Sequence, residues 1–581
     1  MPRHLSKMLL VACALVVASA VVWVAPVAAT HGGDTLVSVG GPSTPFMPNR
    51  QNEPALAVDA NHPNILVAGA NDLIDNEQCN AGDPTTCEFT PGVGAAGVYF
   101  SFDSGDSWTQ PTYTGLTARN CVGPAECKPE VGPIGTPPWY YENGLANFGD
   151  PGVAFGPRRG ADGRFSWENG SRLYYSTIAL TPVGPSGPSF MAVSRTDAVA
   201  AAAAGDKNAW LPPVVVSKQG SATFADKGQL WADNAATSRY FGNVYVCWTP
   251  YRSFSQGNAY PEPLEVATST DGGDTWRQRQ VTPSAANTHS KKQGWGRTSC
   301  TVRTDSQGGV YVFAEQYAAG QPGVDKHLLI KSVDGGASWA KPVSLFSVTD
   351  GSTKIDPIQG WGVLDGAAGA RSGVGDAPAV DIANGAPTGA DATNLMVDSY
   401  VDAVDGLNHE NVVVRTSTNG TSWSGPLNVE SPGDRGYLAA PALSPDGTDL
   451  YVVYNGLTTT YQDTTTTDRG LVGVVLHADI NHGKPMNWTV LHRSVVGDPR
   501  GSGWYDLTAE FLGDYVYAAA TRTYGAGLWT DLRNASVCEA VNTFRQAVHD
   551  GTFAATPAVQ VVCPQGFGNS DIYGGSYPDP S

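Results

Sequence analysis

The chain of 581 residues is poor in charge: only 15% of its residues are Asp, Glu, Lys or Arg. It nevertheless contains 9% aromatic residues, and this combination excludes an intrinsically disordered chain, which needs high charge and few aromatics. The 54 acidic residues outnumber the 35 basic ones, giving a net charge of −19. Such a charge disfavours binding to nucleic acid or to anionic lipid. We therefore expect a folded acidic protein with no nucleic-acid partner.

Several common catalytic motifs are also missing. The sequence has no H-E-x-x-H metal motif, no G-x-S-x-G nucleophile motif, and no Cys and His residues at zinc-binding spacing. Residues 92–97 fit G-x-G-x-x-G, but this segment precedes a strand pattern and opens no helix, so a dinucleotide site is excluded. One Ala-rich run, residues 198–204, is too short to support a helical fold.

What the chain has in abundance is turn-forming and aromatic residues, with 68 Gly, 41 Pro and 15 Trp. This composition is typical of many short strands joined by tight turns. An octapeptide pattern, S-x-D-x-G-x-x-W, occurs at residues 101–108, 269–276 and 332–339, with a degraded copy at 416–423. The Asp can accept N–H groups of its own turn, the Gly allows a positive φ, and the Trp returns to the buried side. Each copy is therefore predicted to be a hairpin tip of a repeat architecture.

A second repeat alternates with the octapeptide: a short alternating strand, a Gly, Asn or Pro turn, and an aromatic-rich strand. Two hairpins make one four-stranded blade, and blades closed into a ring leave only short, protected edges. The sequence thus predicts an all-β fold, a β-propeller of four-stranded blades. Seven blades are favoured; six is the alternative if the first and last inner hairpins share a blade. The seven inner hairpins are residues 54–68, 151–175, 230–248, 301–313, 378–397, 441–454 and 515–529.

The first 29 residues match a secretory signal peptide. Arg3 and Lys7 precede an apolar run over residues 8–27, and small residues stand before Thr30. An uncleaved anchor is the alternative, because the run is long enough to span a membrane. We expect cleavage, a secreted extracellular protein, and no membrane span afterwards. Residues 30–581 then form a single propeller domain, with long first-blade loops (72–140) and a C-terminal closing segment (539–581).

The cysteines indicate a disulfide-bonded protein. Of nine Cys, Cys13 lies in the leader, and the remaining eight form an even set suited to an oxidising compartment. Eight cysteines allow many connectivities. Proximity along the chain favours four pairs: Cys79–Cys87, Cys121–Cys127, Cys247–Cys300 and Cys538–Cys563.

The octapeptide resembles the Asp box, or BNR repeat, of the sialidase superfamily of β-propellers. The resemblance implies the propeller fold and a structural role for each box. It does not separate activities, because Asp boxes also occur in xyloglucanase-type glycosidases, in sortilin-like receptors and in assembly factors without catalysis.

Acidic residues stand at or just before the start of five inner hairpins, and in a propeller these positions ring one mouth of the central channel. Three interpretations stay open: favoured turn residues at strand starts, oxygen ligands for a hard cation such as Ca²⁺, and paired carboxylates that bind substrate or cleave a glycoside. No other cofactor is expected. The five residues are Glu53, Asp150, Asp226 (with Lys227), Asp376 and Asp514.

Comparison with the sialidase family suggests substrate-binding residues. The family opens its first inner strand with Arg-Ile-Pro-Ala-Leu, and this Arg holds the substrate carboxylate. Here residues 52–56 are NEPAL, so Asn52 replaces the arginine and Glu53 adds a negative charge. Arg50, two residues upstream, is the candidate substitute. Candidates for the other two arginines of the family are Arg297 and Arg435, both at inner-strand starts.

The same comparison suggests catalytic residues. The family's acid/base Asp falls in the loop after the first hairpin, where this chain has Asp72 and Asp75. The family's nucleophilic Tyr lies at the start of a late inner strand, which matches Tyr515, with Tyr505 as the rival. Glu510 is the candidate for the carboxylate that activates it.

Two functions remain open at this level. The first is an exo-α-sialidase-like glycoside hydrolase acting on extracellular glycans. The alternative is a non-catalytic propeller that binds a glycan, a peptide or another cell-surface ligand. The loss of the family's arginine favours the second and predicts weak or absent sialidase turnover. In either case we expect a monomer.

Overall fold

The computed structural model describes residues 33–38, 50–77, 90–121, 126–182, 188–217, 223–252, 263–283, 295–318, 325–351, 354–355, 362–366, 375–503, 507–552 and 554–580. These residues form seven antiparallel blade sheets, whose inner strands surround a central channel. The predicted seven-bladed propeller is therefore confirmed, and the six-bladed alternative is wrong. The predicted signal peptide and the Cys79–Cys87 pair lie outside the described residues. Within them, no helix has the length and apolar character needed to span a membrane.

Each blade is a meander that runs from an inner strand at the channel to an outer strand at the periphery. The first blade contains β2 (Gln51–Val58), β3 (Leu66–Asp72) and β4 (Ala96–Ser101), and the second contains β8 (Gly152–Arg159) with the short β7 (Ala146–Asn147), β9 (Phe165–Leu180), β10 (Ser189–Thr196) and β11 (Trp210–Val215). The third contains β12 (Thr223–Ala232), β13 (Val244–Arg252), β14 (Glu265–Ser269) and β15 (Arg277–Gln280). The fourth contains β16 (Trp295–Thr304), β17 (Val310–Ala318), β18 (Asp325–Ser332) and β19 (Val343–Val348).

The remaining blades follow the same order. They are β22 (Ala379–Ile382), β23 (Met396–Asp402), β24 (Asn411–Ser417) and β25 (Leu427–Asn428); β26 (Arg435–Leu443), β27 (Asp449–Leu457), β28 (Leu471–Asn481) and β29 (Lys484–Arg493); and β30 (Tyr517–Ala520), β31 (Tyr524–Asp531), β32 (Asp571–Pro578) and β1 (Thr35–Leu36). Two-stranded sheets β5 (Tyr113–Thr117) with β6 (Glu130–Ile134) and β20 (Lys354–Ile355) with β21 (Gly362–Val363) decorate the loops.

The ring closes by pairing the two ends of the chain. Neighbouring inner strands contact one another all the way round, including β30 against β2. In the seventh blade β32 pairs with β31, and β1 pairs with β32 as its outermost strand, with Thr35 opposite Gly574. The C-terminal segment was predicted to supply the closing strand. It supplies the third strand of the last blade, and the N-terminal strand completes the sheet.

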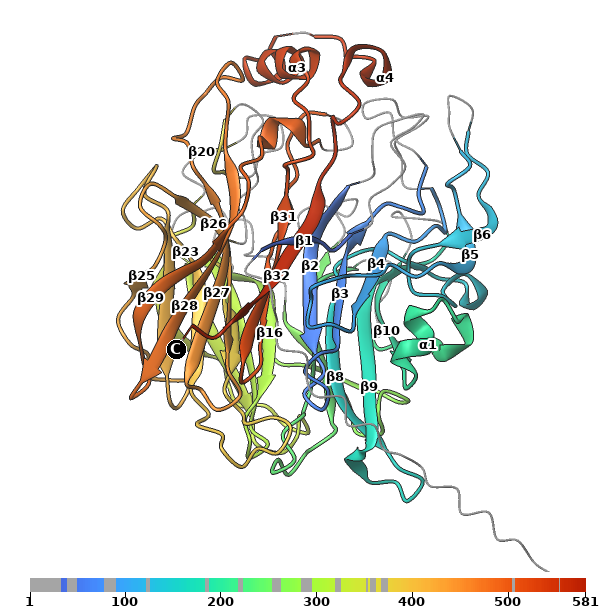
Figure 1. Ribbon diagram of the computed structural model, residues 1–581, viewed down its shortest axis with the longest axis vertical. Helices are drawn as coiled ribbons and strands as arrows, with labels where there is room; N and C mark the ends of the chain where they lie inside the picture. The colour runs from blue at the N-terminus through green and yellow to red at the C-terminus, as the bar shows by residue number, and fades with distance from the viewer. Residues whose placement is uncertain are drawn as a thin grey trace, which may run out of the picture.

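The C-terminal segment also forms a small helical cap. Helices α3 (Glu539–His549) and α4 (Val559–Val562) lie together at the upper end of the molecule in Figure 1. Apolar side chains of α3 pack on Leu507 and Phe567. The buried Arg545 donates hydrogen bonds to the carbonyl oxygens of Leu507 and Ser502 at 3.0 and 2.7 Å. The cap thus fixes the segment that leads into β30. Short helices elsewhere are α1 (Val199–Ala203), η1 (Tyr141–Asn143), η3 (Lys207–Ala209) and η5 (Pro499–Gly501).

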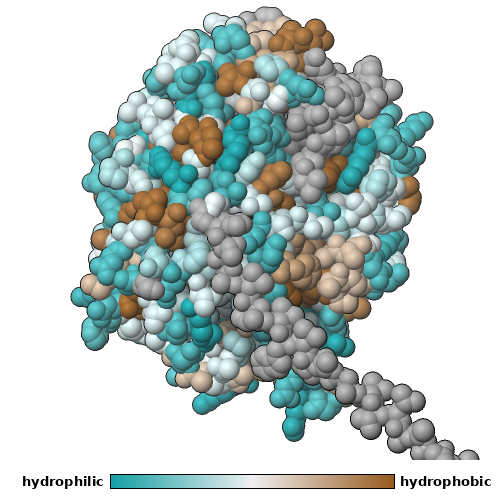
Figure 2. All heavy atoms as spheres, viewed as in Figure 1, coloured by the Kyte–Doolittle hydropathy of each residue, from teal (hydrophilic) through white to brown (hydrophobic). Residues whose placement is uncertain are grey.

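The hydrophobic core lies between the blades. One cluster joins Val67 and Phe100 of the first blade to Phe155 and Tyr175 of the second. The blades approach closely there, because a methyl group added at Gly69 would lie 2.7 Å from a side-chain carbon of Pro151. Hydrophilic side chains cover most of the described outer surface in Figure 2, with apolar residues in scattered patches.

The four octapeptides form the same kind of turn, directly after the third strand of their blades. In the first, Asp103 accepts hydrogen bonds from the Ser101 hydroxyl at 2.8 Å and from the Ser107 N–H at 2.9 Å. Asp271 and Asp334 accept the corresponding bonds in the second and third copies, and Asn419 takes the place of the Asp in the fourth. The four copies are therefore turns in the outer part of their blades, away from the inner strands.

Three of the four predicted disulfides fall within the described residues, and all three are present: Cys121–Cys127, Cys247–Cys300 and Cys538–Cys563. The second joins β13 to β16 and so links the third blade to the fourth. The third encloses the helical cap.

Replacing the octapeptide tryptophan tests its structural role. Trp339 is half-buried and packs on the cluster that contains Val312 and Ile330. Because emptying a fully buried aromatic site costs roughly 3–5 kcal/mol, we expect Trp339→Ala to lower the free energy of unfolding by about 2 kcal/mol. Thermal and chemical denaturation measure this, with Trp339→Phe as the milder control. An unchanged melting temperature in Trp339→Ala would contradict the structural role.

Candidate functional site

The inner strands carry an irregularity at one end of the channel. Pairing with the second strand shifts register between Asn52 and Ala55, between Asp226 and Gln229, and between Thr298 and Thr301. At these interruptions, and just before β8 in the second blade, non-glycine residues adopt a positive φ, which is uncommon and costs on the order of 1–3 kcal/mol. The interrupted ladder turns the affected side chains towards the channel mouth. The residues are Glu53 (55°), Asp150 (48°), Lys227 (54°) and Ser299 (49°).

A cavity of about 250 Å³ opens at this mouth. It continues into a narrower cavity of about 80 Å³ inside the channel, since Lys227 lines both, and Asp514 and Tyr515 line the inner one. The walls of the outer cavity combine charged, amide and aromatic side chains, among them Arg50, Asn52, Glu53, Asn71, Phe148, Asp150, Phe224, Asp226, Lys227 and Phe511. Four of the five acidic residues predicted to ring the channel mouth are therefore brought together.

Hydrogen bonds hold these carboxylates in place. Glu53 accepts the N–H of Asp514 at 3.0 Å and the amide N–H of Asn71 at 2.6 Å. The N–H of Lys227 lies 3.1 Å from Oδ2 of Asp150 and 2.8 Å from Oδ1 of Asp226. The Lys227 ammonium pairs with Asp514 and lies 3.7 Å from Asp226. One lysine thus partly compensates four carboxyl groups.

Two of the carboxyl groups titrate near neutral pH. Burial, reinforced by the charge of Glu53 and opposed by that of Lys227, raises the pKa of Asp150 to about 7. Burial likewise raises the pKa of Asp226 to about 7, again opposed by Lys227 and reinforced by Asp150. The two side chains hydrogen-bond each other. A contacting pair of carboxyl groups with raised pKa values retains a shared proton around neutral pH.

Tyr515 lies beside this cluster, but its electrostatics oppose the predicted nucleophilic role. Its hydroxyl group is buried and has no hydrogen-bond partner among the described residues. Burial, followed by the charges of Asp150 and Glu53, raises the pKa of Tyr515 well above 10, so the phenol stays protonated. An activated phenol would need the opposite shift.

Glu510 belongs to another environment. It lies 4.0 Å from Arg545 under the helical cap, and burial and the Asp365 charge raise its pKa to about 8. The charges that act most strongly on Tyr515 are those of Asp150, Glu53, Asp514 and Asp226, so the structure does not give Tyr515 the Glu510 partner that the sequence comparison suggested. The rival, Tyr505, lies outside the described residues.

Asp72 and Asp75, the acid/base candidates, do not line the cavity. Asp72 accepts hydrogen bonds from Tyr99 at 2.7 Å and from two glutamine side chains at 2.8 and 2.9 Å. Asp75 accepts from Arg119 at 2.8 Å and from the Gly135 N–H at 2.9 Å, and burial raises its pKa to about 6. Both carboxylates hold the loops of the first blade together.

The structure does not assemble the predicted set of three arginines. Arg50 lines the cavity and donates to the carbonyl oxygen of Gly503. Arg435 is held by a bidentate pair with Glu410, at 2.8 and 3.0 Å, and Arg297 donates to the Pro283 carbonyl at 3.1 Å. Neither Arg297 nor Arg435 lines the cavity, so their assignment to it from sequence is corrected.

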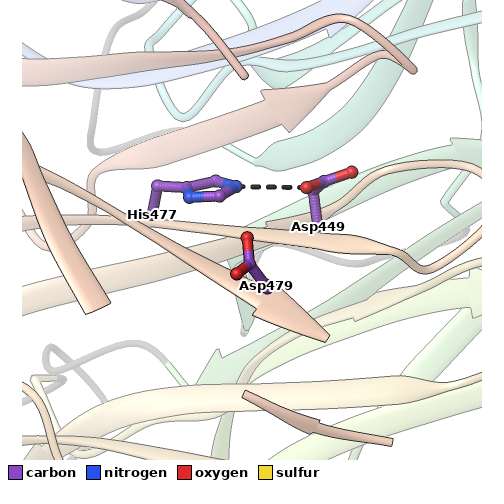
Figure 3. Close-up of side chains that lie close together, drawn as sticks. All are labelled: Asp449, His477 and Asp479. Atoms are coloured by element: carbon purple, nitrogen blue, oxygen red, sulfur yellow. Dashed lines mark hydrogen bonds and ion pairs between the residues drawn. The ribbon is translucent and has the colours of Figure 1, made fainter. Parts of the chain in front are cut away.

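Two further clusters of potential metal ligands lie outside the cavity. Asp376, the fifth predicted acid, joins Glu315 and Asp325 rather than the channel mouth. The second cluster, Asp449, His477 and Asp479, is drawn in Figure 3. There Nε2 of His477 lies 3.2 Å from Asp449, and the side chain of Asn487 donates to Asp479 at 2.7 Å. The side chains of this cluster therefore already have hydrogen-bond partners within the protein.

The sequence analysis missed the uncharged walls of the cavity. Phe148 and Phe224 each stand two residues before a mouth acid, Asp150 and Asp226. This repeated offset was a usable signal. Asn71 and Phe511 gave no such signal, because Asn71 lies on the second strand of its blade and Phe511 lies in a loop.

Of the comparisons with known proteins, the one with solved structures finds similar chains. No family model matches the chain, and no curated protein matches it. Among solved structures it is similar to a Hadza microbial sialidase, at 13% identity over 65% of this chain and 62% of that one, with a TM-score of 0.35. An α-L-arabinofuranosidase from Fusarium graminearum is 11% identical over 76% of this chain and 95% of that one, with a TM-score of 0.34. The intramolecular trans-sialidase from Ruminococcus gnavus is 12% identical over 70% and 89%, with a TM-score of 0.36.

The chain therefore spans less than two thirds of the length of that microbial sialidase. Its seven blades and octapeptide turns are established by its own sheets and hydrogen bonds. At these identities and TM-scores, nothing about the residues of the site follows from the similarity.

The raised pKa of Asp150 predicts a pH-dependent stability. The folded state binds an extra proton between pH 4, where an unfolded Asp titrates, and pH 7. The free energy of unfolding contributed by Asp150 therefore falls as the pH rises through this window. We expect the free energy of unfolding of Asp150→Asn, relative to that of the unmodified protein, to rise by about 3 kcal/mol between pH 5 and pH 8. Denaturation at both pH values measures the difference, and an equal effect at both would refute the shift.

Proposed function

We propose that the protein is a glycoside hydrolase that acts on uncharged glycans at the cavity of the channel mouth. The observation that carries this proposal is the Asp150–Asp226 pair, a proton-sharing carboxyl pair with pKa values of about 7 at a cavity. A carboxylic acid tuned to neutral pH in a cavity is the usual general acid of glycoside cleavage.

The walls of the cavity suit a sugar. Phe148, Phe224 and Phe511 offer apolar faces, and Asn52 and Asn71 offer amide groups for hydroxyls. Aromatic faces with a few placed polar groups are typical of small-ligand sites. The carboxylates outnumber the cations there, which disfavours a carboxylated sugar such as a sialic acid. They favour a transition state with positive charge on the sugar ring.

In the proposed reaction the shared proton of Asp150 and Asp226 passes to the glycosidic oxygen as its bond to the anomeric carbon breaks. Positive charge develops on the ring and is stabilised by the carboxylates of Glu53 and Asp514. Water then adds to the anomeric carbon, and its proton returns to the carboxyl pair. Lys227 keeps Asp514 in place through their ion pair.

We further propose that the protein works outside the cell as a monomer on an extracellular glycan. The three disulfides support an oxidising compartment.

A non-catalytic glycan-binding propeller is the second candidate. One observation favours it: Asp150 and Asp226 are in hydrogen-bond contact, whereas the two carboxyl groups of a retaining glycosidase stand about 5 Å apart. In this case the same cavity would bind a sugar end without cleaving it.

The decisive measurement is hydrolysis of a panel of fluorogenic glycosides by the purified protein. We expect turnover of a neutral glycoside and little or none of a sialoside. Asp150→Asn should lower kcat by about 100-fold or more, as expected for loss of a general acid. Tyr515→Phe should change kcat by less than about threefold, because its phenol stays protonated in the proposed reaction.

Matched controls are Asp72→Asn and Asp75→Asn, which alter buried carboxylates outside the cavity and should affect stability rather than kcat at low temperature. Strong sialoside hydrolysis abolished by Tyr515→Phe would replace this proposal with the tyrosine mechanism. Glycan binding without turnover of any glycoside, lost in Asp150→Asn, would establish the binding propeller.

A further inference from the structure

A group of three carboxylates lies between the fourth and fifth blades. Glu315 comes from β17, Asp325 opens β18, and Asp376 stands just before β22. One oxygen atom of each lies within 4.8 Å of the others. The three residues are only 2–5% exposed. The chain therefore brings three negative charges from two blades into one buried space.

The neighbouring His327 fixes this arrangement. It faces Glu315 across the β17–β18 ladder, and its Nε2 donates to the backbone carbonyl of Asp376 at 2.7 Å. Its Nδ1 lies 2.7 Å from the carboxylate of Asp398. Both ring nitrogens of His327 thus contact either the Asp376 backbone or the Asp398 side chain. They are therefore not available to hydrogen-bond the three clustered carboxylates.

Two of the carboxylates present oxygen atoms without partners. Oε2 of Glu315 and Oδ2 of Asp376 are buried and accept no hydrogen bond from any described residue. Leaving a buried charged acceptor unsatisfied costs several kcal/mol unless a proton or a cation compensates it. Both atoms belong to carboxylates of this cluster, so a bound cation would compensate them.

The charges around the cluster also favour a bound cation. The charged groups that act on Glu315 are Asp325 and Asp350, and those that act on Asp376 are Glu315, Asp350 and Asp325. All of these groups are acidic. At the channel mouth, by contrast, the Lys227 ammonium lies among the carboxyl groups.

We propose that Glu315, Asp325 and Asp376 bind one Ca²⁺ ion where the fourth and fifth blades meet. The ligand set is entirely oxygen, which suits a hard cation. Calcium binds its oxygen ligands at about 2.3–2.6 Å in flexible geometry. Three carboxylate oxygen atoms that lie within 4.8 Å of one another can therefore share one such ion.

The ion would tie the channel wall to the fourth blade. Gly375, Ala377 and Pro378, on either side of Asp376, line the inner cavity. The Pro378 carbonyl also accepts a hydrogen bond from Thr301 of β16 at 2.8 Å. Binding at Asp376 therefore stabilises the wall segment between the blades. This role is independent of the glycosidase proposed above.

The test uses the full secreted chain, stripped of metal with EGTA and then dialysed. We expect Ca²⁺ titration by calorimetry to show one site per chain, and the melting temperature to rise with Ca²⁺ because the ion binds the folded state. Asp376→Asn and the isosteric Glu315→Gln should each weaken the affinity at least tenfold. In EGTA, Glu315→Gln should melt at or above the unmodified protein, because it removes repulsion between buried carboxylates.

Asp449→Asn is the matched control, since it alters the other cluster of potential ligands and should leave the Ca²⁺ affinity unchanged. If Ca²⁺ neither binds the stripped protein nor raises its melting temperature, the proposal is wrong. Equal affinity in Glu315→Gln and the unmodified protein would place the ion elsewhere and also overturn it. A Mg²⁺ titration shows whether the site prefers the larger ion.

Discussion

The pairing of β1 with β32 is the contact on which the propeller depends. Seven blades around a channel form a closed ring only if the last sheet contacts the first, and here strands from opposite ends of the chain share one sheet. The closed ring brings β2 against β30 and so places Glu53 beside the N–H of Asp514, 461 residues further along the chain. The channel mouth exists because of this closure.

The repeated inner strand then explains why charges gather there. Each blade brings the start of its inner strand to the same rim, and in the first, third and fourth blades a local interruption of the ladder turns a side chain towards the channel. Acidic residues at several of these positions are forced close together by the geometry of the ring. The fold tolerates them because Lys227 and a shared proton offset the charge of Glu53, Asp150, Asp226 and Asp514.

The blades and the mouth acids could be predicted from sequence because both depend on local, repeated patterns. The octapeptide encodes its own turn, as the bonds of Asp103 to residues two and four positions away show. The roles of single polar residues could not be predicted this way. Asp75 is held by Arg119 and Thr136, 44 and 61 residues distant, and Glu510 by the cap residue Arg545. Only the folded chain shows that such partners already occupy these carboxylates.

The two carboxylate clusters are different solutions to the same electrostatic problem. At the mouth, a lysine and a shared proton reduce the charge, which leaves a titratable acid at the cavity. Between the fourth and fifth blades, the charges that act on Glu315 and Asp376 are negative, and two oxygen atoms stay without donors. Asp376 occupies a place in its blade comparable to that of Asp150, yet it turns to the neighbouring blade. In our two proposals the same repeat position thus serves proton chemistry in one blade and cation binding in another.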